Sequence, residues 1–381
     1  MRNQVGTKGW TARSRRVLAG TIALALAIPL GASVFVGCGK KKGDAEAAPS
    51  PGGGLDDPKN DAAVVTAAKA ALACDWGTSG LKYDCPALKT WRESPLLKDG
   101  KADTTLIAML GDAKDPVRWL AAEALANQGK TYEKDAALAN QVIGASQAEK
   151  QPLIAGPLGR ATGNIDAKAT NLGEAMKTLA KTHAVVDYRK AIIGSMLFAN
   201  RELFYDFVVD LARNDKNDDV RRAALSAPWT GTPPGRSPDS CKLWLDQVDD
   251  PKPDNGGEAA YLCAFYPNDG GCKAQWDPLL TKLETRAKGG KVQASQMSSA
   301  LKYLWQQKGA SNAQKDRAVA IAKALVENPA NGGSPRGNAL RFVAEAEGDK
   351  AKPFAKRFEG DKEFFVKSSA KDILDGKVKK L

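Results

Sequence analysis

Apolar residues recur with the 3.6-residue period of an α-helix through almost the whole chain after residue 61. Segments such as 117–128, 188–198 and 318–326 place apolar side chains at positions i, i+3, i+4 and i+7. Runs of alternating β-branched residues, which would favour strands, are scarce. Short stretches rich in Gly, Asp, Asn and Pro separate the helical segments, as helix caps and tight helical connections require. The pattern predicts an all-α protein.

One short motif occurs twice along the chain. Residues 115–125 (DPVRWLAAEAL) align without gaps with residues 218–227 (DDVRRAALSA), and the two copies share Asp, Val, Arg and two alanines. Fainter copies begin near Tyr188, Pro335 and Val366. The intervals between successive copies divide into units of about 30–40 residues, which is the period of a helical repeat array.

The motif D-x-V-R-x-x-A-x-x-A resembles the second helix of HEAT repeats, especially the short HEAT-like repeats of bacterial proteins. The resemblance implies a right-handed α-solenoid of stacked helical hairpins, HEAT-like or armadillo-like, over residues 61–381. It also implies that Asp115, Arg118, Asp218 and Arg221 form hydrogen bonds between neighbouring repeats. We therefore expect these four residues to be structural rather than catalytic.

The first 37 residues have the layout of a signal peptide. Five basic residues and no acidic residue precede an uncharged apolar stretch at 17–37. The sequence FVGC at 35–38 resembles the lipobox of bacterial lipoproteins, in which the peptide is cleaved before a cysteine that then receives lipid, although Phe35 stands where Leu is usual. The resemblance implies lipidation of Cys38 and a lipid-anchored protein of the bacterial envelope, with its body in the periplasm or at the cell exterior.

Two alternatives at the N-terminus stay open. The pair Arg15-Arg16 resembles a twin-arginine export motif, so export by either the general or the twin-arginine route is compatible with the sequence. The apolar stretch is also long enough for an uncleaved membrane helix with an unmodified Cys38. Residues 38–60 contain the cysteine followed by charge, Ala, Pro and Gly, which predicts a flexible tether with a span of about 26 Å.

The net charge gives little reason to expect a nucleic-acid partner, and we expect none. The formal charge is +12, but the first 37 residues supply five basic side chains, which leaves 51 basic against 44 acidic residues. This moderate excess is weak evidence for nucleic acid, and an envelope location weakens it further. A solvated surface of mixed charge accounts for the excess, and contact with an anionic surface or polymer, such as lipid headgroups or cell-wall material, is the alternative.

Five cysteines besides Cys38 agree with an oxidising compartment. Cys74 and Cys85 flank one short loop, and Cys263 and Cys272 flank a turn-rich segment, so we expect these two disulfides. Cys241 would then be free, but it can equally pair with Cys263 or Cys272, because sequence does not fix connectivity.

The segment 228–272 departs from the repeat pattern and predicts a loop-rich insertion on one face of the repeats. It is rich in Pro and Gly and contains three of the five cysteines. Such loops often carry binding specificity, so Trp229, Arg236 and Lys252 are candidate binding residues; a connection without a binding role is the alternative. The aromatic residues of this segment are expected to lie in the core, and they are Tyr261, Phe265 and Tyr266.

Signals for catalysis, cofactors and metals are poor. No nucleophile elbow, zinc-protease motif, P-loop or dinucleotide fingerprint occurs, and the chain has one histidine, His183. His183 has Asp187 one helical turn later, but a surface histidine is the simpler interpretation. We expect that the chain is not an enzyme and that it holds no cofactor or metal ion. We expect instead a scaffold or adaptor that binds a protein partner. The alternatives are an envelope enzyme or enzyme accessory acting on cell-wall or protein substrates, and a purely structural lipoprotein.

Overall fold

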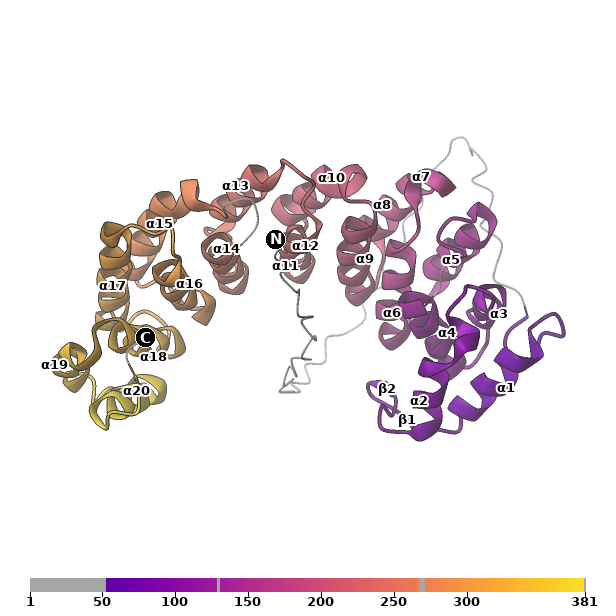
Figure 1. The fold of residues 1–381 in the computed structure, drawn as a ribbon, viewed down its shortest axis with the longest axis horizontal. Coiled ribbons are helices and arrows are strands. Elements are labelled where there is room, and N and C mark those ends of the chain that lie inside the picture. Colours follow the sequence, from indigo (N-terminus) through magenta and orange to yellow (C-terminus); the bar gives the residue numbers. More distant parts are fainter. Residues whose placement is uncertain (1–52, 129–130, 267–270, 380–381) are drawn as a thin grey trace, which may run out of the picture. The chain divides into compact units, whose positions relative to one another are not determined.

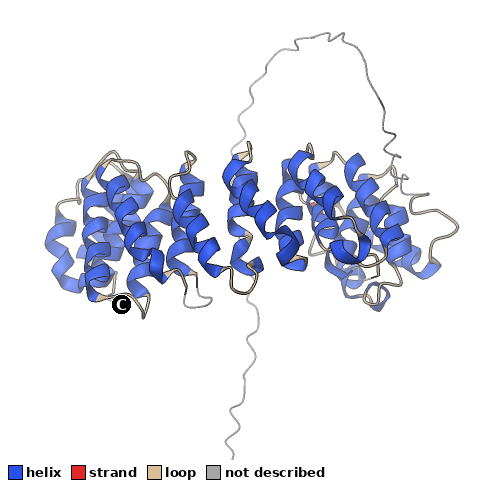
Figure 2. Ribbon diagram, turned by 90° about the horizontal axis from the view of Figure 1, so that it is seen from above, coloured by secondary structure: helices blue, strands red, loops and turns tan. Residues whose placement is uncertain are grey.

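The computed structural model describes residues 53–128, 131–266 and 271–379. Helices make up most of this part of the chain and its two strands form one short hairpin, so the protein is all-α, as the sequence predicts (Figure 2). The expected signal peptide, the lipobox with Cys38 and the first part of the expected tether lie outside the described residues. Within the described ranges, no helix is both long and apolar enough to cross a bilayer.

A series of helices forms what we call the first row, in which each member packs against the next member along the chain (Figure 1). Its members are α4 (Asp115–Gln128), α6 (Pro152–Gly163), α9 (Val186–Ala199), α11 (Asp218–Ser226), α14 (Pro253–Phe265), α16 (Ser295–Gln306), α18 (Gly333–Glu347) and α20 (Phe364–Leu374). The starts of successive members follow each other at the interval expected for helical repeats, roughly 30–40 residues. The motif copies expected from the sequence all fall near the N-termini of first-row helices, so one repeat unit contains one such helix.

A second row contains the helices that precede the first-row helices in the chain. Its members are α3 (Asp103–Met109), α5 (Ala136–Ala148), α8 (Gly173–Thr182), α10 (Arg201–Asn214), α13 (Ser237–Gln247), α15 (Trp276–Lys288), α17 (Asn312–Glu327) and α19 (Lys352–Lys356). Each packs against the first-row helix that follows it. Each unit is therefore a helix pair that shares its apolar face with the next pair. Two single-turn helices lie between units, α7 (Ala167–Thr170) and α12 (Pro228–Gly231).

The N-terminal part of the described chain contains α1 (Ala62–Ala71), α2 (Pro86–Glu93) and a hairpin of strands β1 (Trp76–Gly77) and β2 (Gly80–Leu81). The disulfide Cys74–Cys85, one of the two expected, encloses this hairpin. The expected tether ends earlier than residue 60, because Leu55 is buried in the core and donates its backbone N–H to Asp112 at 2.9 Å. The sequence missed this contact because a single apolar residue stands among polar and glycine residues.

Local sequence explains where many helices begin. Helices α1, α5, α7 and α11 each begin after a capping residue whose side-chain oxygen accepts hydrogen bonds from two backbone N–H groups of the helix. These capping residues are Asp61, Asp135, Asp166 and Asn217. At α17, Ser311 and Gln314 form a reciprocal capping box. Helices α2, α6 and α14 begin with Pro, which lacks only an N–H that would have no helical partner at that position.

Two glycines of α6 allow α9 to pack closely on it. A Cβ atom at Gly159 would lie 2.6 Å from the carbonyl oxygen of Tyr188, and one at Gly163 would lie 2.8 Å from the backbone nitrogen of Met196. Both obstacles are backbone atoms, which cannot rotate away as a side chain can. The distance between α6 and α9 therefore depends on the absence of a side chain at these two positions.

Candidate functional site

Four first-row helices carry an arginine at their fourth position that reaches the start of the next first-row helix. Each arginine pairs with a carboxylate three residues before that next helix, in the pairs Arg118–Glu149, Arg189–Asp215, Arg221–Asp250 and Arg336–Asp361. The nitrogen–oxygen distance is 2.9 Å in the first and third pairs and 2.6 Å in the fourth. We call these four contacts the bridging pairs.

The carboxylate of each bridging pair also binds the backbone at the start of the next helix. It accepts a hydrogen bond of 2.7–2.9 Å from the N–H of the residue just before that helix, and the donors are Gln151, Asn217, Lys252 and Glu363. Hydrogen bonds with one charged partner are stronger than neutral ones. Each bridging pair therefore holds the N-terminus of one first-row helix against the preceding first-row helix.

The four residues expected to be structural take part in these contacts. Arg118 and Arg221 cross between neighbouring units, whereas Asp115 and Asp218 lie one turn before them and pair with them at 2.7 and 2.8 Å. Asp115 also accepts a hydrogen bond from Gln151 of the next unit at 3.1 Å. Their charge is thus used in helix packing.

His183 occupies the position of the bridging carboxylate at the contact between α6 and α9. It lies three residues before α9, its Nδ1 accepts from the N–H of Val185 at 3.1 Å, and its Nε2 lies 2.9 Å from the carbonyl oxygen of Ser146. The ring is half-buried and stacks on Tyr188 at 4.1 Å, so it is not the surface histidine that the sequence suggested. Asp187 pairs with Lys190 instead, so the structure does not bring the His183–Asp187 pair together.

Residues 228–272 differ from the loop-rich insertion that the sequence suggested. This segment contains α13 and α14, which pair with each other, and α14 packs on α11 and α16 as a regular member of the first row. The Pro and Gly residues of this segment indicated loops in the sequence, but in the structure many of them begin helices or lie inside them. At Gly256, for example, a Cβ atom would lie 2.6 Å from the carbonyl oxygen of Val248, so this glycine serves close packing.

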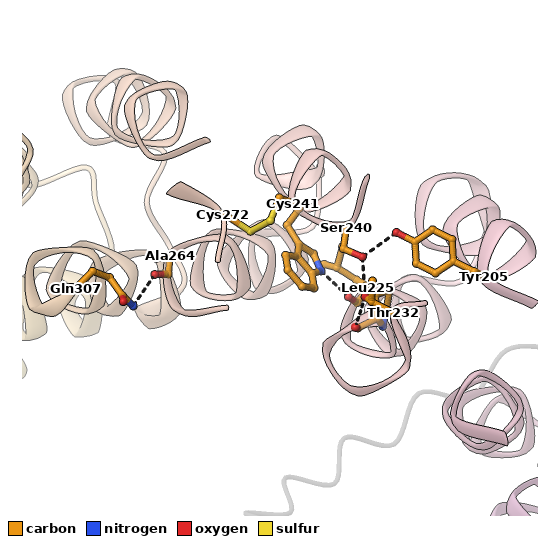
Figure 3. Close-up of a disulfide and its surroundings, with 10 residues drawn as sticks. Tyr205, Leu225, Thr232, Ser240, Cys241, Ala264, Cys272 and Gln307 are labelled. Atoms are coloured by element: carbon orange, nitrogen blue, oxygen red, sulfur yellow. Dashed lines mark hydrogen bonds between the residues drawn. A yellow bond between two sulfur atoms is a disulfide. The ribbon is translucent and has the colours of Figure 1, made fainter. Parts of the chain in front are cut away.

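The second expected disulfide is wrong. Cys272 pairs with Cys241 of α13, and Cys263 is the free cysteine among the described residues (Figure 3). The physical reason is that α14 continues to Phe265 and directs Cys263 into the core, where the side chain is fully buried. Burial raises the pKa of the Cys263 thiol to about 12, so it stays protonated and unreactive at neutral pH.

Polar contacts hold α13 beside the disulfide in place (Figure 3). The hydroxyl of Ser240 forms hydrogen bonds with Tyr205 at 2.7 Å and with Thr232 at 2.8 Å. On the same helix, the indole N–H of Trp244 donates to the carbonyl oxygen of Leu225 at 2.9 Å. The hydrogen bonds of Ser240 and Trp244 fix α13 against α10 and α11, and the disulfide joins it to the segment after α14.

The three candidate binding residues do not form one loop. Trp229 and Arg236 lie in and after α12, whereas Lys252 lies at the other end of the unit, just before α14. A helix of 13 residues such as α14 is about 20 Å long, which separates Lys252 from the α12 end. Arg236 is held by Asp206 and Asp239, and Lys252 lies 3.9 Å from Asp218. Only Trp229 joins a larger surface feature.

That feature is a set of four half-buried rings that we call the aromatic row: Trp229, Tyr261, Phe265 and Tyr303. Trp229 stacks on Phe265 with ring centroids 5.4 Å apart, and Phe265 contacts Tyr303 at 4.8 Å. Tyr261 contacts Phe265 at 5.6 Å and Tyr303 at 5.3 Å. The row thus connects α12, α14 and α16 through direct ring contacts.

Tyr261 and Phe265 were expected in the core, and only the third aromatic residue, Tyr266, is buried there. The position of Tyr261 and Phe265 relative to the polar residue Glu258 could have indicated that their rings lie at the surface. Glu258, Tyr261 and Phe265 are related by i, i+3 and i+7 and share one side of α14, and alanine, leucine and cysteine fill the opposite side.

Charged and polar groups flank the aromatic row. Before Tyr261 on the same side of α14, Glu258 accepts a hydrogen bond from the Ser226 hydroxyl at 3.1 Å. Beside Tyr303, Lys302 pairs with Glu345 of α18 at 2.7 Å. A cavity of about 180 Å³ lies there between α16 and α18, and its lining includes Ser299, Lys302, Asn338, Arg341, Phe342 and Glu345. The surface combines rings that can pack with side chains that can form hydrogen bonds.

The aromatic row and the polar groups that flank it can bind a partner through ring packing and hydrogen bonds. Within the residues that the structure describes, no group of three or more His, Cys, Asp or Glu side chains is arranged to hold a metal ion. No protein-family model matches the sequence, and no curated protein is significantly similar to it. The aromatic row, with its direct ring contacts across α12, α14 and α16, is the candidate site on which a functional proposal can be built.

Proposed function

We propose that the chain is a lipid-anchored α-solenoid scaffold of the bacterial envelope whose first row binds a segment of a partner protein. The aromatic row is the observation that carries this proposal. Trp and Tyr are the residues most enriched at the energetic centres of protein interfaces, together with Arg. Rigid rings present a large contact area and lose little conformational entropy when a partner covers them.

The solenoid architecture is supported by the order of helix contacts. Every first-row helix packs on the next one and on its own second-row partner, which is the nearest-neighbour pattern of helical repeat proteins. The bridging pairs supply a contact that recurs from one unit to another, as the HEAT-like resemblance implies. In such a scaffold, successive first-row helices present one continuous surface to a partner.

An extended peptide segment fits this surface best. Apolar side chains of the partner would pack on the exposed edges of the aromatic row, and one side chain would enter the 180 Å³ cavity beside Tyr303. Arg341 and Lys302 line that cavity and have N–H groups that can donate to backbone carbonyl groups of the partner. Anchoring through Cys38 would keep the scaffold at the membrane.

The experiment compares the partners that the full chain captures from detergent-solubilised envelopes before and after Phe265→Ser and Tyr303→Ser are introduced together. Removing two interface aromatics costs about 2 kcal/mol or more, so we expect at least about a thirtyfold loss of one captured protein, measured by quantitative mass spectrometry.

Two controls separate binding from folding. Tyr83 is 61% exposed and lies outside the aromatic row, so Tyr83→Ser should leave capture unchanged. Tyr303→Phe keeps the ring and should retain most of the capture, while circular dichroism and thermal unfolding check that the helices persist. If the double variant is folded and captures the same proteins in the same amounts, the aromatic row is not the binding surface.

A further inference from the structure

Helix α20 carries two adjacent phenylalanines that the described residues leave exposed. Phe364 is 75% exposed and Phe365 is 59% exposed, and their rings meet edge to face at 5.7 Å. Helices α18 and α19 pack on other sides of α20, and no later helix follows within the described chain (Figure 1). Two neighbouring exposed rings on one helix form an apolar patch of the kind that marks a contact surface.

The surroundings of these rings are positively charged. Phe364, Lys367 and Lys371 are related by i, i+3 and i+7, so they share one side of α20, and both lysines are exposed. Two of the nearby acids are already engaged, since Asp361 pairs with Arg336 and Asp372 pairs with Arg341. Glu363, next to Phe364, forms no ion pair within the described ranges. Neither lysine forms an ion pair within the ranges that the structure describes. The exposed lysines Lys362, Lys367 and Lys371 outnumber Glu363, so the surface combines exposed rings with an excess of positive charge.

We propose that this C-terminal tip, made of Phe364, Phe365, Lys367 and Lys371, binds the surface of an anionic lipid bilayer. Apolar rings insert at the boundary of headgroups and acyl chains, and lysines nearby interact with acidic headgroups. Lysine is depleted in protein–protein interfaces, and a symmetric contact between two copies would bring their lysines together. Both arguments favour a bilayer over a second copy of the chain.

This contact goes beyond the proposed scaffold role and does not depend on lipidation of Cys38. It lies at the opposite end of the chain from the proposed anchor. Residues 47–381 form one structural unit, and the core within it extends from Leu55 to Ile373. The isolated body can therefore be tested in the absence of the apolar N-terminal stretch.

The test measures binding of residues 47–381 to sedimented vesicles that contain phosphatidylglycerol, and to vesicles of phosphatidylcholine alone. We expect binding to the anionic vesicles that weakens as salt is raised. Phe364→Ser with Phe365→Ser should lower the affinity at least tenfold, and Lys367→Gln and Lys371→Gln should each lower it about fivefold. The matched control is Phe198→Ser, at a phenylalanine on α9 that is 65% exposed, and it should leave binding unchanged.

Three results would overturn the proposal. The first is an absence of binding to anionic vesicles, and the second is equal affinity for the two vesicle types. The third is a concentration-dependent dimer that Phe364→Ser with Phe365→Ser abolishes while vesicles remain unbound, which would identify a second copy as the occupant. The two lysine variants keep the test valid if the phenylalanine variant proves unstable, because charge removal on an exposed face leaves the core intact.

Discussion

Replacing Arg336 with alanine should lower the free energy of unfolding by about 3–5 kcal/mol, which is the usual cost of breaking a buried ion pair. The Arg336 side chain is 2% exposed, and that of its partner Asp361 is 12% exposed. Arg336 also donates from Nε to the carbonyl oxygen of Val326 at 2.9 Å. Alanine would leave a buried carboxylate and a buried carbonyl group with one partner fewer. Equilibrium unfolding in urea measures the effect.

The matched control for this prediction is Arg341→Ala on the same helix. Arg341 pairs with Asp372, but its side chain is 45% exposed, so its removal should cost less than about 1 kcal/mol. If both variants lose the same stability, burial does not determine the strength of these contacts.

The effect of Arg336→Ala should also depend on pH. Burial opposes ionisation of Asp361, but hydrogen bonds from Arg336 and from the N–H of Glu363 outweigh it, and the pKa of Asp361 lies below its ordinary value of 3.8. A carboxylate with a lowered pKa stabilises the folded state above the unfolded-state pKa and loses this contribution as pH falls. The stability difference between the variant and the parent should therefore be full near neutral pH and shrink as pH falls below about 3.8.

Replacing Gly159 with alanine should destabilise the protein by about 1–3 kcal/mol, because the added methyl group forces α6 and α9 apart. The new Cβ atom would lie 2.6 Å from a backbone oxygen of α9. Gly156 offers a matched control one turn earlier in α6, where a Cβ atom meets nothing within 4 Å. Alanine has the higher helix propensity, so Gly156→Ala should stabilise by up to about 1 kcal/mol.

Thermal and chemical unfolding of the two variants give the comparison. Opposite signs for the same chemical change on one helix would show that α6 requires glycine for packing at one position and tolerates it at the other. Equal stabilisation by both substitutions would mean that α6 and α9 are not in close contact in solution.

The sequence predicted the helices and their repeat interval because both follow from local periodicity. The copies at Val117 and Val220 mark α4 and α11, and each interval between copies corresponds to the number of steps along the first row from one copy to the next. The bridging arginines Arg118 and Arg221 were visible for the same reason, since the repeat motif contains them. Their partners Glu149 and Asp250 were not visible, because they lie 31 and 29 residues further along the chain and only the packing of successive helices brings each to its arginine.

Other features could not be predicted because they depend on contacts between helices. Gly256 lies in a segment with loop composition, but the close approach of Val248 explains the glycine. Cys241 pairs with Cys272 because α13 and the segment after α14 meet in space, which spacing alone cannot indicate. The aromatic row likewise joins Tyr261 of α14 and Tyr303 of α16, which belong to neighbouring repeat units.

Each helix pair packs on its neighbours, and we propose that the repeat units together form one extended solenoid. Small-angle X-ray scattering of the protein part formed by residues 47–381 tests this extended arrangement most directly. A compact globule of this length has a radius of gyration of about 20 Å. An extended solenoid should have a radius of gyration clearly above that compact value, and its distribution of interatomic distances should have a long tail. A symmetric distribution with a radius equal to the compact value would contradict it.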